Sequence, residues 1–260
     1  MAPSAPATVD ELGLQGCLYL WALLTGQEHR LPVAQTRRMT LVVMAYLLER
    51  GVIEVPWPEA RWDVKPDART TPIEGLQWRL IWTVYEPARL IDALDDYFDS
   101  LERDDFATAQ RLRLWMELGS GEAERFFEQQ LVKHRFCADW AQDVAFAYRE
   151  STAVLTLAQW RYCAWAAVRR GASMALQHGP QADGLRDTIY QELRRRAATV
   201  ASGAWTGCSF PPYNPQPESA LGRGFVHRLT RLGALYWTGW PSVEVLLGHQ
   251  LDRSQRVGGP

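Results

Sequence analysis

The sequence lacks the features that mark membrane and secreted proteins. Its longest apolar runs, residues 17–24 and 41–48, are far shorter than the roughly 20 residues with which a helix crosses a bilayer. The first residues have neither the basic nor the apolar segment of a signal peptide. The 4 cysteines are scattered without a C-x-x-C pair, which favours reduced thiols over disulfides or a zinc site. We therefore expect a cytoplasmic protein that makes no membrane contact.

Lysine is scarce as well, because Lys65 and Lys133 are the only two and 26 of the 28 basic residues are arginine. We interpret this bias as the mark of a GC-rich bacterial genome, although arginine also suits interfaces better than lysine. Phosphate-binding glycine motifs and the H-E-x-x-H zinc motif are both missing. The net charge of −2 argues against attraction of the whole protein to nucleic acid, but leaves room for a local basic patch. We expect no catalytic residues, no metal and no cofactor.

The amino-acid composition is that of an ordinary globular protein. The chain has 260 residues, of which 47% are hydrophobic and 22% charged, so it can bury a sizeable core. Apolar residues recur at three- and four-residue steps through most of it. The sequence predicts a mainly α protein of about ten helices, with at most one small β-hairpin near residues 52–64. That hairpin would pair residues 52–55 with 61–64, and helices are expected over residues 71–85, 105–118 and 122–134, among others.

Residues 156–178 are predicted to form the central helix. Thr156 and Gln159 have the spacing of a capping box, in which each side chain accepts a hydrogen bond from the other's backbone N–H. Small residues punctuate the apolar face at Ala164, Ala167 and Gly171. We expect another helix to approach closely at this face.

A domain boundary is expected near residues 65–72. It would separate an N-terminal helix–helix–hairpin unit, residues 1–70, from a helical body, residues 71–260. Residues 202–218 contain four prolines and two glycines, and they therefore predict an irregular Pro/aromatic loop inside that body.

Binding of a protein partner is the function that the composition favours. Tryptophan, of which there are 12, and arginine are the types enriched at interface hot spots. A Pro/aromatic loop presents large side chains with little loss of entropy, although it can equally be a connector that places its aromatic rings in the core. We predict a non-enzymatic bacterial protein of the toxin-neutralising (immunity) or regulatory kind. Its expected contact residues are Trp57, Trp62, Trp205, Phe210 and Tyr213.

Nucleic-acid binding is a second hypothesis. The order helix, helix, hairpin at the N-terminus resembles a winged-helix module, which places a helix in the major groove. Arg37 and Arg38 on the second helix and Arg61 on the hairpin would then contact DNA. The apolar residues 41–48 instead favour a core helix.

A third hypothesis concerns Asp95, Asp96 and Asp99, which form a D-D-x-x-D string on a predicted helix. The string resembles the motif with which terpene synthases and prenyl-diphosphate synthases hold Mg²⁺ against a diphosphate, since hard oxygen ligands one turn apart can share metal ions. The resemblance covers five residues and implies a Mg²⁺-dependent diphosphate enzyme. A broader acidic, solvated helix face explains the same residues.

Two other groups have a chemical and a structural interpretation. Cys208 is a candidate nucleophile if His227 or His249 lies within reach as a base, but a lone cysteine is more often an inert small hydrophobe. Residues 194–196 are three consecutive arginines, with Arg186 two turns earlier. We interpret them as a solvated face near a helix C-terminus.

Overall fold

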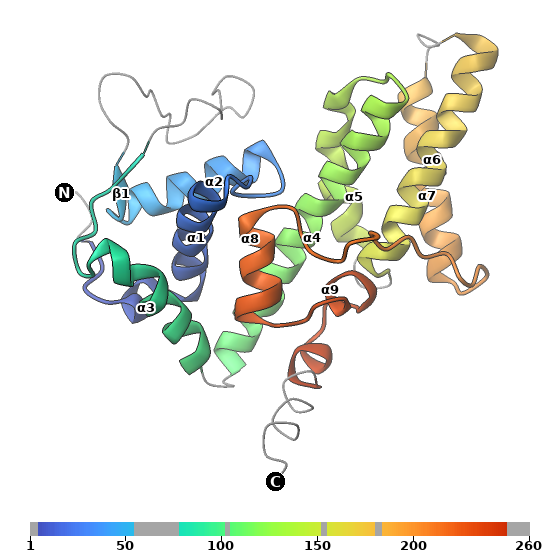
Figure 1. The fold of residues 1–260 in the computed structure, drawn as a ribbon. Coiled ribbons are helices and arrows are strands. Elements are labelled where there is room, and N and C mark those ends of the chain that lie inside the picture. The colour runs from blue at the N-terminus through green and yellow to red at the C-terminus, as the bar shows by residue number, and fades with distance from the viewer. Residues whose placement is uncertain (1–4, 55–77, 102–104, 152–154, 180–183, 249–260) are drawn as a thin grey trace. The chain divides into compact units, whose positions relative to one another are not determined.

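The computed structural model describes residues 5–54, 78–101, 105–151, 155–179 and 184–248, and it confirms the mainly α fold (Figure 1). The α-helices are α1 (Val9–His29), α2 (Arg37–Glu49), α3 (Pro87–Ser100), α4 (Asp105–Lys133), α5 (Val144–Ser151), α6 (Leu157–His178), α7 (Leu185–Ala201), α8 (Ala220–Arg223) and α9 (Leu235–Thr238). A 3-10 helix η1 (Ala138–Asp143) and a π-helix η2 (Gly224–Leu229) complete them, and residues 243–248 are also helical. Over these ranges, no helix combines the length and apolarity that a membrane span requires.

The chain divides into two compact units. Unit 1 consists of Met1–Arg111 and Pro217–Arg231, and unit 2 of Leu112–Gln216 and Leu232–Pro260. The boundary expected near residues 65–72 lies outside the described residues. The observed division follows from the late segments α8 and η2, which pack against α1 of unit 1.

Unit 1 is built on α1, whose residues are mostly buried. Thr8 caps this helix by accepting a hydrogen bond from the Glu11 N–H. The Glu11 carboxylate accepts one from the Ala7 N–H at 2.7 Å. The π-helix η2 lies so close to α1 that a Cβ on Gly224 would be 2.7 Å from the Trp21 ring. Only glycine fits there without a shift of the ring.

The small sheet has one expected strand and one unexpected strand. β1 (Ile53–Glu54) lies where the hairpin was predicted, but it pairs antiparallel with β2 (Arg79–Leu80). The other half of the predicted hairpin, residues 61–64, lies outside the described residues. The helix expected over residues 71–85 is wrong at 78–85, where the chain forms β2 and then irregular structure.

Trp82 explains that error. Its ring is buried, and its indole N–H donates to the Pro6 carbonyl at 2.7 Å. The spacing of Trp78, Trp82 and Tyr85 imitates the buried stripe of a helix. Here burial comes from the N-terminal segment instead.

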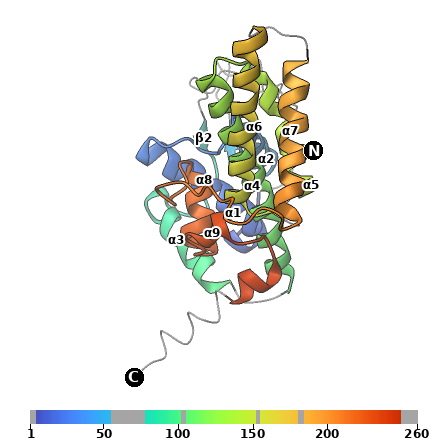
Figure 2. The same cartoon turned by 90° about the vertical axis from the view of Figure 1, so that its right-hand side faces the viewer.

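Unit 2 is organised by α6 and α7, which lie side by side in both views (Figures 1 and 2). The predicted capping box is present, because the Gln159 N–H donates to Thr156 Oγ1 at 3.2 Å and the Thr156 N–H donates to Gln159 Oε1 at 2.9 Å. A Cβ on Gly171 would lie 2.4 Å from Ile189 Cγ1 of α7. The predicted close approach of another helix is confirmed.

Helix α4 is a single helix where two were expected, over residues 105–118 and 122–134. It runs without interruption through Gly119 and Gly121. Gly119 serves packing, since a Cβ there would be 2.5 Å from the Tyr148 hydroxyl oxygen on α5.

Candidate partner-binding surface

The Pro/aromatic loop of unit 2, residues 202–216, has no regular secondary structure but is fixed at two points. The Phe210 N–H donates to the Ala158 carbonyl in the first turn of α6 at 2.9 Å. The Trp237 indole N–H of α9 donates to the Pro215 carbonyl at 2.5 Å. The stretch between Phe210 and Pro215 is therefore attached at both ends, and it contains Pro211 and Pro212, whose rings restrict the backbone further.

The aromatic side chains of this loop differ in exposure. Tyr213 is fully exposed, and Trp205 is half-buried. Phe210 is 42% exposed, with its ring centre 6.1 Å from that of Phe126 and 6.0 Å from that of Trp165. One side of Phe210 thus packs on unit 2 and the other faces solvent, which combines the surface and core interpretations of the loop.

Two arginines of α6 stack on this aromatic cluster. The Arg161 guanidinium lies 4.3 Å from the ring centre of Phe126, 5.3 Å from Trp237 and 5.9 Å from Phe210. The Arg169 guanidinium lies 4.8 Å from the ring centre of Trp165. Such cation–π contacts are favourable by about 0.5–2 kcal/mol each. The arginine–aromatic surface consists of Arg161, Trp165, Arg169 and Phe210, and the buried rings of Phe126 and Trp237 lie beneath it.

Sequence reasoning missed both arginines. Burial lowers the pKa of Arg161, and Glu122 acts in the opposite direction, but an arginine stays protonated under ordinary conditions. The signal was present in the sequence, because Arg161, Trp165 and Arg169 recur at intervals of four and so share one helix face.

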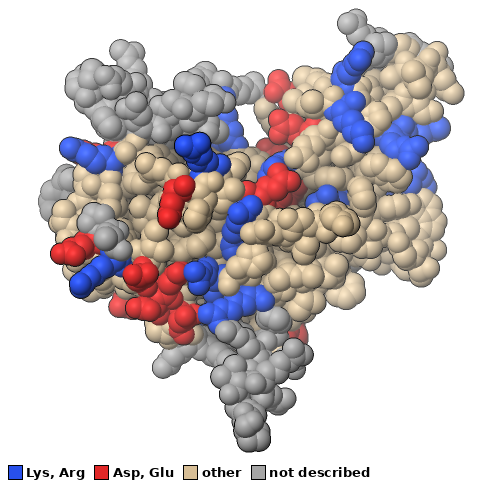
Figure 3. Space-filling model, in the orientation of Figure 1, with Lys and Arg blue, Asp and Glu red and all other residues tan. Residues whose placement is uncertain are grey.

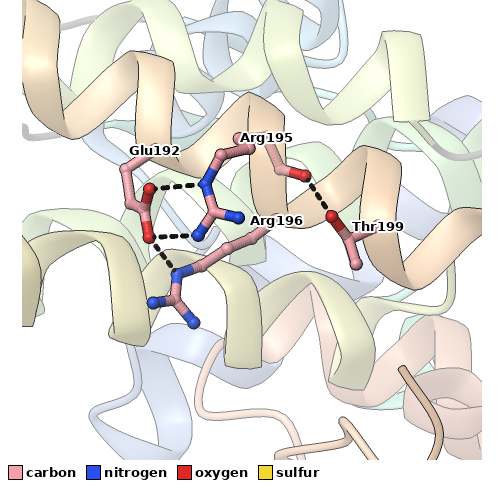
Figure 4. A network of polar contacts seen from close by, with 4 residues as sticks. All are labelled: Glu192, Arg195, Arg196 and Thr199. Atoms are coloured by element: carbon pink, nitrogen blue, oxygen red, sulfur yellow. Dashed lines mark hydrogen bonds and ion pairs between the residues drawn. The ribbon is translucent and has the colours of Figure 1, made fainter. Parts of the chain in front are cut away.

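Trp205 contacts a second group of arginines, on α7, and Figure 4 shows these arginines with Glu192. The Glu192 carboxylate accepts hydrogen bonds from Arg195 at 2.8 and 2.9 Å and from Arg196 at 2.7 Å. The two guanidinium carbons lie 5.7 and 5.5 Å from the Trp205 ring centre. The hydrogen bonds from Arg195, followed by those from Arg196, lower the pKa of Glu192 to about 2 against the effect of burial.

The arginines at 194–196 are therefore only in part the solvated face that the sequence suggested. Arg194 and Arg195 are exposed and Arg196 is half-buried. Arg195 and Arg196 also pair with Glu192 and lie near the Trp205 ring.

Cys208 lies beside a tyrosine. The Tyr162 hydroxyl lies beside the Cys208 side chain, and this proximity raises the pKa of Tyr162. Of the two histidines named as alternative bases, His227 belongs to unit 1 and His249 lies outside the described residues. All four cysteines of the chain are free.

The acidic string of α3 is engaged in ion pairs within unit 1. Asp95 accepts a hydrogen bond from the Trp21 indole N–H at 3.0 Å and pairs with Arg228 at 3.1 Å. Asp99 pairs with Arg231, while Asp96 is exposed. Figure 3 shows acidic side chains beside basic ones in this part of unit 1.

Burial and these contacts determine the pKa of Asp95 and how accessible the acidic residues are to a metal ion. Burial raises the pKa of Asp95, and Arg228 and Trp21 oppose that shift only in part. A Mg²⁺ ion would have to displace arginines from Asp95 and Asp99. Across the part of the chain that the structure describes, no group of three or more His, Cys, Asp or Glu residues is placed to hold a metal. The diphosphate-enzyme hypothesis stays a prediction.

The residues of the nucleic-acid hypothesis are only partly described. Arg37 and Arg38 begin α2 after the Thr36 cap; Arg38 is exposed, and Arg37 is half-buried with its Nε unpaired. Arg61 lies outside the described residues, as do the predicted contact residues Trp57 and Trp62. Apolar residues of α2 face the interior of unit 1, as expected of a core helix; they are Leu41, Val43, Met44 and Leu47.

Comparison of the chain with protein-family models, with curated proteins and with solved structures finds no match. Its function has to be inferred from the residues themselves.

Proposed function

We propose that this chain is a non-enzymatic, cytoplasmic bacterial protein that acts by binding a protein partner, as immunity-type and regulatory proteins do. The observation that supports this proposal is the exposure of Phe210 and Tyr213 on a backbone attached at Ala158 and Trp237. An aromatic side chain on a fixed backbone loses little conformational entropy when it is buried by a partner. Free cysteines suit a reducing compartment such as the cytoplasm.

The neighbouring residues support the same function. Tryptophan, tyrosine and arginine dominate interface hot spots, where they form clusters surrounded by contacts that exclude water. The arginine–aromatic surface joins these residue types beside the loop, and its Arg161 and Trp165 are half-buried. Side chains that are already ordered need less rearrangement on binding.

The test is capture of partners from a lysate of the source organism with the tagged chain, followed by mass spectrometry and repeated after nuclease treatment. Replacing Phe210 and Tyr213 together by alanine is expected to weaken the captured complex at least about tenfold. The melting temperature should change little, because Tyr213 is exposed and Phe210 is partly so. Phe146→Ala is the matched control, since Phe146 is 64% exposed on α5 of the same unit.

Three results would count against the proposal. Capture that is unchanged in the double variant would remove the loop from the interface. Loss of capture that accompanies a large fall in melting temperature would make the loop a structural element. Partners that disappear after nuclease treatment would favour the nucleic-acid alternative, in which Arg37→Ala with Arg38→Ala lowers a salt-dependent affinity for duplex DNA.

A further inference from the structure

We infer that the arginine–aromatic surface recognises carboxylates, so that the protein partner presents an acidic segment to it. This inference rests on the proposed function and names the chemistry of the partner at the same surface.

The local charge is the first argument. Helix α6 contains three arginines and no acidic residue, and the loop 202–216 contains no charged residue at all. Helix α7 adds four arginines against Asp187 and Glu192. In Figure 3, the region where Figure 1 shows α6 is mostly tan, with scattered basic side chains. The chain as a whole is slightly negative, at −2, so this positive charge is a local property that attracts an acidic ligand.

The second argument is the lack, in the part of the chain that the structure describes, of a direct ion pair at Arg161 and Arg169, although the charge of Glu122 acts on Arg161. Within the described ranges, neither Arg161 nor Arg169 forms an ion pair, and the buried Nε of Arg161 has no hydrogen-bond partner. Both guanidinium groups lie against aromatic rings and keep N–H groups that can donate. A planar guanidinium binds a carboxylate through two parallel hydrogen bonds in that plane.

Unit 2 itself contains an example of the proposed contact. Arg195 lies near the Trp205 ring. It also donates two hydrogen bonds to Glu192, which Figure 4 shows. Arg169 lies over Trp165 in a similar way but lacks the carboxylate. A glutamate or aspartate of the partner would supply it.

The same features favour a protein over a single-stranded nucleic acid. A nucleic-acid site needs positive charge that follows the phosphate backbone past the rings on which bases stack. Here the loop that presents Phe210 and Tyr213 has no basic residue. An acidic segment with apolar side chains between its carboxylates matches the alternation of arginine and aromatic ring.

The first experiment uses the full chain and two short fluorescent peptides, one of alternating Glu and Tyr and one with Gln in place of Glu. Fluorescence anisotropy should show binding of the Glu peptide, weakened by salt, and at least about tenfold weaker binding of the Gln peptide. Arg169→Ala and Arg161→Gln should each weaken binding of the Glu peptide about tenfold. Arg113→Ala is the control: it removes an exposed charge from α4, about 20 Å along the helix axis from Phe126.

His134 provides a readout that does not depend on the Arg161 variant remaining folded. Burial, Lys133 and Arg169 together lower the pKa of His134. A carboxylate that pairs with Arg169 should raise this pKa, which an NMR titration of the imidazole measures with and without the Glu peptide. In the free protein, Arg169→Ala should also raise it.

Equal affinity for the two peptides, or no binding of either, overturns the inference. Tighter binding of an oligodeoxythymidylate than of the Glu peptide also overturns it and assigns the surface to nucleic acid. Capture that is lost on replacing Phe210 and Tyr213 but kept in Arg169→Ala overturns only the acidic-segment inference. Capture that survives the loop variant contradicts the proposed function itself.

Discussion

Each unit holds a carboxylate against arginines, and the two carboxylates respond in opposite ways. Glu192 of unit 2 accepts three hydrogen bonds from two arginines of its own helix, and its pKa falls to about 2. Asp95 of unit 1 pairs with Arg228 and Trp21, yet its pKa rises, mainly through burial, with the charges of Asp99 and Asp92 acting in the same direction. An arginine nearby is therefore not enough to stabilise a carboxylate; the number of hydrogen bonds and the loss of water decide the direction.

The largest change in stability is expected when the packing of α6 against α7, the helix that carries Glu192, is disturbed. In Gly171→Val, the new Cβ would meet Ile189 Cγ1 at 2.4 Å, so the Ile189 side chain or the two helices must shift. We expect the free energy of unfolding to fall by about 2–3 kcal/mol, measured by urea denaturation. Ser173→Val, at an exposed position of the same helix, should change it by less than about 1 kcal/mol. Equal stability of the two variants would show that the helices do not pack as described.

Glu192→Gln tests the unit 2 side of the comparison. The folded pKa of Glu192 lies below its ordinary value of 4.5, so ionised Glu192 stabilises the folded chain above that value, and the contribution is lost as the pH falls toward about 2. The variant should be less stable at neutral pH by up to about 1 kcal/mol. As the pH falls, the free energies of unfolding of the variant and of the original chain should become equal. If the difference between them instead grows as the pH falls, the direction assigned to the pKa of Glu192 is wrong.

Asp95→Asn tests unit 1 and should show the opposite slope. The folded pKa lies above the ordinary 3.8, so the folded chain binds the proton more tightly than the unfolded chain. The stability of the original chain relative to the variant is greatest below 3.8 and decreases as the pH rises through the folded pKa. Amide-for-carboxylate replacement keeps an oxygen for the Trp21 N–H. If the stability difference between original chain and variant changes with pH in the same direction for Asp95 and Glu192, the contrast between the two carboxylates is wrong.

The smallest effect is expected at Asp99, whose pair with Arg231 is largely exposed. Asp99→Asn should change the free energy of unfolding by less than about 0.5 kcal/mol. The same variant examines the metal alternative: Mg²⁺ that raises the melting temperature of the original chain but not of Asp99→Asn would favour the diphosphate-enzyme hypothesis, as would Mg²⁺-dependent turnover lost in Asp95→Ala.

The sequence predicted those features of the fold that depend on residues close together in the chain or on one helix face. The capping box at Thr156 and Gln159 spans one helical turn, and the close approach at Gly171 follows from small residues on one face of α6. The capping box could be predicted because its two residues are near in sequence. The close approach could be predicted because only small residues permit such a contact. In contrast, Arg79–Leu80 carries no alternation long enough to indicate a strand, and its pairing with Ile53–Glu54 spans a long connection.

The candidate site was predictable only where it depends on residue composition and not on tertiary contacts. Composition drew attention to Phe210 and Tyr213, and the structure places both at the surface of the loop. The rings under Arg161 come from α4, α9 and the loop, so their convergence depends on tertiary packing. The ion pair between Asp95 and Arg228 joins segments far apart in the chain and left no trace in the local sequence.

The two attachments of the loop also bear on how this protein can diversify. Both use backbone carbonyls, of Ala158 and Pro215, and one uses a backbone N–H, so they depend little on which side chains the loop carries. Substitutions between Phe210 and Pro215 can therefore accumulate without disturbing the helices beneath. If the proposed partner contacts Tyr213, changes in this stretch would alter the partner while the packing of unit 2 stays the same.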